Sequence, residues 1–217
     1  MNRGVALAHE HGIVTSASLM VHGQDVDTAA ELARQHPALS IGLHVDIAEW
    51  EYRDGGWIAR YERVPADNAD ALRQEVVAQL GTFERLIRSP PTHLDSHQHA
   101  HRVEPLRSIL TEVAEDLKIP LRHGSGPAVY CGSFYGQSAR GEPFLEGITL
   151  TALFRVLDEL GDGITELGCH PAEIADLDTS YRDERLAELA VLCDPRVRPA
   201  LAERRIVLAS FLDITIP

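Results

Sequence analysis

Four histidines and one aspartate occupy every second position between residues 93 and 101. They are His93, Asp95, His97, His99 and His101, in a chain of 217 residues that contains 11 histidines. Side chains two residues apart point to the same side of a β-strand, so an extended segment would present all five together. Converging imidazole and carboxylate groups are typical ligands of zinc and other borderline divalent ions. Because a catalytic zinc takes about three protein groups, the segment predicts a metal or catalytic site in which only some of these histidines are ligands.

Two other predicted strand ends carry groups of the same kind. His44 and Asp46 lie on one face of a strand predicted over residues 40–47, and His170 follows a strand predicted over residues 164–169. The C-terminal ends of parallel strands lie on one face of an α/β barrel, so these groups are expected to converge. A metal ion there would polarise a carbonyl and lower the pKa of bound water to near 7, and a further histidine could protonate a leaving group. The residues therefore favour a hydrolytic metal site.

The elements that must position these groups alternate between strands and helices. Six strands are predicted, over residues 13–21, 40–47, 92–95, 119–122, 164–169 and 206–210. Helices are predicted over residues 2–11, 25–35, 67–89, 104–116, 150–160, 182–191 and 196–203. No internal repeat or linker-like run interrupts the alternation, which predicts a parallel sheet or an α/β barrel in one domain over residues 1–217.

Residues 49–65 are predicted to form a polar, aromatic loop. Loops of this length are often lids or substrate walls, and a partly packed surface excursion is an equal alternative. Trp50, Tyr52 and Trp57 could stack on sugar rings, or they could pack the loop onto the domain.

The composition restricts the class of partner. Hydrophobic residues make up 44% of the chain and charged residues 24%, as is ordinary for a soluble globular domain. The net charge of −13 argues against nucleic acid, whose phosphates require clustered lysine and arginine. No apolar run approaches the roughly 20 residues of a membrane span, and the first residues lack a signal-peptide core. Three widely spaced cysteines fit a reducing compartment, so a cytoplasmic protein is predicted.

Other classes of protein fit the residues less well. A metal-dependent phosphoesterase would gather more carboxylates and a basic phosphate clamp, for which Arg102 and Arg122 are the obvious candidates. A cysteine hydrolase is disfavoured because Cys169 and His170 are neighbours in a strand, and neighbouring side chains point apart. A non-catalytic metal- or sugar-binding protein stays open.

Six stretches of the sequence together resemble a known family. They are residues 13–21 (IVTSASLMV), 41–44 (IGLH), 91–97 (PTHLDSH), 121–122 (LR), 134–136 (FYG) and 169–171 (CHP). The sequence is similar in these stretches to the YdjC-like carbohydrate deacetylases, which include chitooligosaccharide deacetylases and are relatives of the polysaccharide deacetylases. The resemblance implies a distorted (β/α) barrel of about seven strands and one divalent metal ion, Zn²⁺ or Mg²⁺. It also implies removal of the N-acetyl group from an acetylated amino sugar or oligosaccharide.

The resemblance also implies roles for individual residues of this chain. His44 and His97 match the two histidine ligands of the metal, and His170 matches the position of the general acid. Arg122 and Asp95 complete the catalytic set. Arg122 is expected to orient the catalytic groups or the substrate, and Asp95 is expected to orient a metal-binding histidine. Substrate contacts are predicted at His99, Phe134, Tyr135 and Trp50.

The sequence departs from the family pattern at its beginning. Family members start with a strand that ends in Asp-Asp-Phe-Gly, whereas this sequence starts after it. Six strands and two of the three family metal ligands are therefore expected, with Asp46 and Asp95 as the nearest carboxylates that could substitute. A full deacetylase of which this is the greater part is favoured, and a weak or inactive enzyme is the alternative. The expected partner is the acetylated sugar, without nucleic acid or membrane, and a homodimer stays open.

Overall fold

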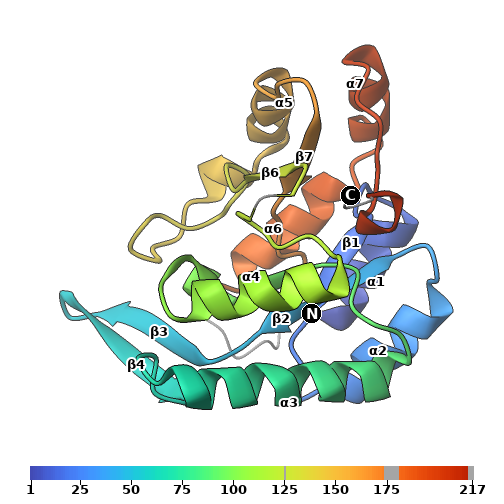
Figure 1. Ribbon diagram of the computed structural model, residues 1–217. Coiled ribbons are helices and arrows are strands. Elements are labelled where there is room, and N and C mark those ends of the chain that lie inside the picture. Colours follow the sequence, from blue (N-terminus) through green and yellow to red (C-terminus); the bar gives the residue numbers. More distant parts are fainter. Residues whose placement is uncertain (125, 174–180, 215–217) are drawn as a thin grey trace. The chain divides into compact units, whose positions relative to one another are not determined.

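A computed structural model describes residues 1–124, 126–173 and 181–214 (Figure 1). The chain forms two compact units, and each of them combines segments that are distant in the sequence. Unit 1 contains residues 1–15 and 128–210, and unit 2 contains residues 16–127 and 211–217. Each unit is described by itself.

A parallel three-stranded sheet lies at the centre of unit 2, in the order β1 (Ser16–Leu19), β2 (Ser40–Val45), β5 (Leu94–Ser96). The register pairs Leu43 of β2 with Leu94 of β5, and both side chains are completely buried. Parallel strands buried on both faces are rich in apolar residues, as β2 is. The predicted α/β architecture is confirmed.

Unit 2 also contains three helices and two short 3-10 segments among its described residues. They are α2 (Val26–Gln35), α3 (Ala69–Ile87), α4 (Leu106–Leu117), η1 (His97–Arg102) and η3 (Phe211–Asp213). Asn68 caps α3, because its side chain accepts a hydrogen bond of 3.0 Å from the backbone N–H of Ala71. The core of the unit joins apolar residues of the sheet to those of α3 and α4, among them Leu43, Val45, Leu72, Phe83, Leu94 and Leu110.

Residues 49–65, predicted as a loop, contain a β-hairpin instead. Strand β3 (Ala48–Arg53) pairs antiparallel with β4 (Gly56–Glu62). Asp54 and Gly55 form the two-residue connection with positive φ angles of 52° and 85°, as in the turns that favour Asp-Gly. Carboxylate oxygens of the buried Asp46 then accept hydrogen bonds from the Tyr61 hydroxyl and the Arg63 guanidinium, both at 2.8 Å. The loop prediction was wrong because the Asp54-Gly55 turn allows the two polar segments on either side of it to pair as strands.

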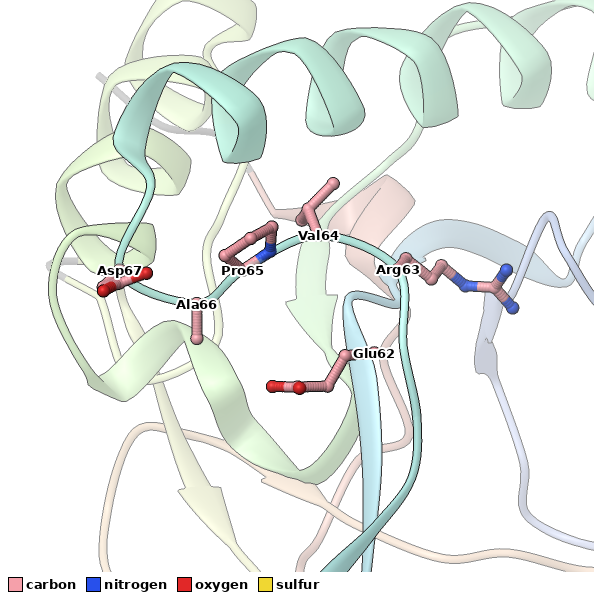
Figure 2. A pocket seen from close by; sticks show the side chains of 6 residues that line it. All are labelled: Glu62, Arg63, Val64, Pro65, Ala66 and Asp67. Carbon is pink, nitrogen blue, oxygen red and sulfur yellow. The ribbon is translucent and has the colours of Figure 1, made fainter.

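The connection from β4 to α3 lines an open depression on unit 2. Figure 2 shows its six lining residues, Glu62 to Asp67, with the Arg63 side chain pointing away from the hollow. None of these six is among the residues predicted for the active site. The Arg63 guanidinium forms its ion pair with Asp46.

Unit 1 combines the N-terminal helix with the C-terminal part of the chain. Its elements are α1 (Asn2–Glu10), β6 (Ala128–Cys131), η2 (Leu145–Ile148), α5 (Leu150–Asp158), β7 (Ile164–Leu167), α6 (Asp183–Leu192) and α7 (Val197–Glu203). Strands β6 and β7 pair in parallel. Helix α1 contacts α6, and a Cβ at Gly4 would lie 2.4 Å from the Ala172 Cα, so this helix requires glycine where it approaches the chain after His170.

Two predicted strands are absent from the described residues. Residues 119–122 form only a single parallel bridge, between Leu121 and Leu94. Residues 206–210 do not form a strand, and Val207 remains 85% exposed, since no strand pairs with this segment in the part of the chain that the structure describes. Strand β6 lies outside the six predicted strands, in a part of the sequence that is rich in glycine. The described strands form three separate sheets, and no closed barrel is detected among them.

None of the helices in the described ranges is both long enough and apolar enough to cross a membrane.

Replacing Gly42 by alanine is expected to lower the free energy of unfolding by about 1–3 kcal/mol, because the core is overpacked. A Cβ at this position would lie 2.5 Å from ring atoms of His93. That ring cannot easily move away, since it stacks on Phe211 with centroids 3.9 Å apart. Urea denaturation measures the loss. Gly56→Ala is the matched control, because its Cβ would meet nothing within 4 Å; equal stabilities of the two variants would contradict the prediction.

Candidate active site

Asp95 joins two other predicted site residues in unit 2. The parallel register of β2 and β5 pairs His44 with Asp95, and the His44 Nδ1 lies 2.7 Å from the Asp95 Oδ1. Arg122 reaches the other carboxylate oxygen at 2.6 Å. Its position is set by the backbone, because the Arg122 N–H donates to the carbonyl of Leu94, one residue before Asp95. The register of two strands and one bridge thus assembles His44, Asp95 and Arg122.

The electrostatics of this group keep Asp95 ionised. Burial alone would raise the pKa of its carboxyl, which is 1% exposed. The neighbouring His44 and Arg122 outweigh burial and hold the pKa of Asp95 well below its usual range. An ionised Asp95 accepts the Nδ1–H of His44, so the lone pair of this ring lies on Nε2.

His97 lies beside His44 at the end of β5. The two ring centroids are 5.7 Å apart and the rings are inclined by 72°. A histidine that donates one nitrogen to a carboxylate and offers the other to an ion is the usual arrangement behind metal ligands. His44 and His97 therefore fit a divalent metal ion by donor type and spacing, with Asp95 behind His44.

The histidine segment does not continue as a strand beyond Ser96. Gln98 and His99 have left-handed φ angles of 49° and 54°, and η1 replaces the extended backbone. Ser96 closes this turn, because its hydroxyl accepts the backbone N–H of His101 at 2.9 Å and lies 2.7 Å from the His101 Nδ1. The expectation that all five groups share one face was wrong. His99 and His101 instead gather with His123, which follows Arg122.

His93 has a packing role in unit 2. It is 2% exposed, and its ring nitrogens lie 3.0 Å from the Ser18 hydroxyl and 2.9 Å from the Thr92 hydroxyl. Burial lowers its pKa to about 4, so the ring is neutral at neutral pH. Asp46 is also structural, since Tyr61 and Arg63 occupy its carboxylate, and the option that it substitutes for a metal ligand is not supported by these contacts.

The predicted general acid, His170, lies in unit 1 shortly after β7. Its backbone N–H donates to the Glu188 Oε2, and the Arg185 guanidinium lies 3.4 Å from its carbonyl oxygen. The ring of Tyr135 meets the ring of His170 edge-on, with centroids 5.3 Å apart. The position of His170 is therefore set through its main chain by α6, and its ring is flanked by Tyr135.

Glu188 is a buried acid that sequence reasoning missed. It is completely buried and accepts a hydrogen bond of 2.5 Å from the Tyr181 hydroxyl in addition to the one from His170. Burial raises its pKa to about 7. The signal in the sequence was the spacing of Glu184, Glu188 and Leu192, which places two acids on the buried face of a helix.

The predicted substrate contacts fall in both units. In unit 2, Trp50 is 40% exposed on the hairpin, and its backbone N–H and carbonyl are both hydrogen-bonded by the side chain of Gln98, at 2.9 and 2.6 Å. The hairpin is thus attached to the segment that carries His99. In unit 1, Tyr135 is half-buried beside His170, whereas Phe134 is completely buried.

Comparisons with known proteins cover almost the whole chain. A family model described as "YdjC-like protein" matches residues 1–203. Chitooligosaccharide deacetylase of Serratia marcescens is 32% identical over 241 aligned residues, which cover 98% of this chain and 93% of that protein. Chitooligosaccharide deacetylase of Yersinia pestis (strain Pestoides F) is 30% identical, with 98% of this chain and 92% of that protein covered.

Two solved structures share the fold. A protein of Enterococcus faecalis V583, described as a cellobiose-phosphate cleavage protein, superposes with a TM-score of 0.80 at 23% identity, over 99% of this chain and 93% of that one. A family 4 carbohydrate esterase from Streptomyces lividans, in complex with acetate, superposes with a TM-score of 0.55 at 11% identity, over 100% of this chain and 90% of that one. The match to the family model and the identity to the deacetylases confirm the resemblance seen in the sequence: the chain belongs to the YdjC-like protein family.

Proposed function

We propose that this protein is a divalent-metal-dependent hydrolase that removes the acetyl group from N-acetylated amino sugars and their oligosaccharides. The observation that carries the proposal is the pair of His44 and His97, with Asp95 holding the Nδ1 of His44 at 2.7 Å. The names of the deacetylase relatives supply the substrate class.

His44 and His97 would hold the ion; of Zn²⁺ and Mg²⁺, the two ions that the resemblance implies, imidazole ligands favour Zn²⁺. The chemistry that such an ion supplies when bound is polarisation of the amide carbonyl. Asp95 is a positioning residue in this proposal, because it fixes the ring and the tautomer of His44 and is itself held by Arg122.

The protein groups move one proton to complete the hydrolysis. Water adds to the amide carbonyl carbon and releases its two protons to solvent, from which His170 is protonated again. The C–N bond breaks with its electron pair on nitrogen, and acetate and a free amine are formed. His170 in its protonated form gives its proton to the departing amine nitrogen, as a general acid does. Its main chain is held by Glu188, so the ring is presented from a fixed backbone. Tyr135 and Trp50 are proposed sugar contacts, and Trp50 offers an exposed aromatic face suited to stacking. His99 was predicted with them, but its ring gathers with those of His101 and His123. Phe134 was also predicted as a sugar contact, but it is completely buried and is left out of the proposal.

The proposal is tested by measuring acetate and free amine released from N-acetylglucosamine oligomers in the presence of Mg²⁺, Zn²⁺ or Co²⁺. We expect His170→Asn to lower kcat by about 10²–10⁴-fold with little change in oligomer binding, since general acid catalysis contributes that much. Mutating a residue that only hydrogen-bonds a metal ligand typically weakens metal binding by ~10–100-fold. His44 is a proposed ligand itself, so we expect His44→Gln to weaken metal binding by more than this.

His11→Gln is the control, because this side chain is 67% exposed at the end of α1. Binding of ion and oligomer without any release of acetate would favour the alternative, a non-catalytic metal- and sugar-binding protein. Unchanged kcat in His170→Asn would remove this residue from the mechanism.

A further inference from the structure

Three histidines outside the proposed catalytic pair gather in unit 2. His99 and His101 come from η1, and His123 comes from the turn after Arg122. One potential ligand atom from each of the three lies within 4.8 Å of the others. The ring centroids are 5.2 Å apart for His99 and His123, 5.8 Å for His101 and His123, and 6.1 Å for His99 and His101.

These spacings are close to those of three imidazoles around one ion. Zinc lies ~2.0–2.1 Å from each imidazole nitrogen in a tetrahedral site, which places each ring centre ~3 Å from the ion and the centres ~5 Å from one another. The observed separations of 5.2–6.1 Å exceed this by about one ångström or less. Small rotations of the side chains would bring the three nitrogens to ligand distance.

The orientation of His101 supplies independent support. The residue is 2% exposed, and its Nδ1 is engaged by the Ser96 hydroxyl at 2.7 Å. Its Nε2 is buried, and the ring also interacts with the backbone of Arg122, the residue before His123. A ligand atom of this ring lies within 4.8 Å of those of His99 and His123, so the buried ring is already close to the other two potential ligands. An imidazole held at one nitrogen by a hydroxyl can ligate through the other.

The backbone also holds the other two histidines in unusual conformations. His99 has a φ of 54° and His123 a φ of 59°, a region that residues other than glycine seldom adopt. Such conformations cluster at ligand clamps, where the surrounding structure enforces them. Two cations, Arg102 and Arg122, lie near His123. The repulsion that they exert on a bound ion is reduced, because Arg102 is exposed to solvent and the guanidinium of Arg122 is paired with Asp95 at 2.6 Å.

We propose that His99, His101 and His123 form a metal site of their own, distinct from the His44–His97 pair. Three neutral nitrogen ligands suit Zn²⁺, Co²⁺ or Ni²⁺, whereas Mg²⁺ demands oxygen ligands. With three protein ligands, the site keeps a fourth position for water or another small ligand. An ion held there connects η1 to the residues that follow the Leu121 bridge, and thereby fixes the backbone on both sides of Arg122.

The test uses the full chain in a His44→Gln background, which removes one ligand of the other pair. Chelator-treated protein is titrated with Co²⁺, followed by its absorption spectrum, and with Zn²⁺ in competition. We expect His44→Gln protein to bind one ion. Adding His123→Gln should weaken that binding by more than ~100-fold, because loss of a direct ligand lowers metal affinity more than loss of a residue that hydrogen-bonds a ligand. His123 is exposed, so this variant is expected to fold.

His22→Gln in the same background is the matched control, since His22 is also an exposed histidine of unit 2 and lies beside Glu75 at 2.9 Å. It should bind the ion as the His44→Gln protein does. The proposal is overturned if His44→Gln protein binds no Co²⁺ or Zn²⁺, or if adding His123→Gln leaves the affinity unchanged. Because the readout is binding, neither outcome depends on whether the protein deacetylates a sugar.

Discussion

The Asp95→Asn variant is expected to unfold with a free energy lower by about 3–5 kcal/mol, because breaking a buried ion pair leaves its partner uncompensated. The partner here is Arg122, whose side chain is only 14% exposed and lies 2.6 Å from the carboxylate. The same change should weaken metal binding by ~10–100-fold, since Asp95 orients His44. Urea denaturation and metal titration measure the two effects.

The stability that Asp95 contributes should depend on pH with a definite sign. Its pKa is depressed in the folded protein, so its contribution is complete above the ordinary value of 3.8 and is lost as the pH falls further. The difference in stability between wild type and Asp95→Asn should therefore shrink in acid. Glu112→Gln, which breaks an exposed pair with Arg73, should change neither stability nor metal binding. An Asp95→Asn protein as stable as wild type would contradict the role assigned to this carboxylate.

The contribution of Glu188 to the free energy of unfolding is expected to fall as the pH rises from about 4.5 to about 7, while buried neutral histidines such as His93 contribute with the opposite sign. Burial raises the pKa of Glu188 from 4.5 to about 7, so the folded state retains a proton that the unfolded state has released. The contribution of Glu188 is then complete below pH 4.5 and is lost as the pH rises through the folded pKa. Linkage gives a loss of roughly 3 kcal/mol for a shift of this size.

Glu188→Gln should remove this part of the pH dependence. Urea denaturation at a series of pH values gives the slope for each protein. Glutamine also changes the hydrogen bonds to His170 and Tyr181, but that effect is the same at every pH and leaves the slope as the readout. Glu203→Gln, an exposed change on α7, should retain the wild-type slope. If Glu188→Gln also retained it, Glu188 would titrate normally in the folded protein.

Local patterns in the sequence predicted the elements that carry the site. The strand predicted over residues 40–47 contains β2, and the Asp-Gly pair in the sequence marks the turn of the hairpin. The contact of His44 with Asp95 depends on the register between two strands that are 51 residues apart, and residue types alone do not fix such a register.

Two features of the site lay beyond sequence reasoning for physical reasons. Alternating histidines predicted a long strand, but the hydrogen bonds of Ser96 with His101 stabilise a turn in which Gln98 and His99 take left-handed angles. A tertiary contact therefore overrides the local preference. Glu188 ranks as an ordinary helical acid until its partners Tyr181 and His170 are known, because its pKa depends on burial.

The attachment of the hairpin to η1 uses only the main chain of Trp50. The Gln98 side chain accepts a hydrogen bond from the N–H of Trp50 and donates one to its carbonyl, while the residue stays 40% exposed. The attachment of the hairpin therefore does not depend on which side chain stands at position 50. A substitution at position 50 would therefore change the exposed surface of the hairpin and leave both hydrogen bonds to Gln98 in place.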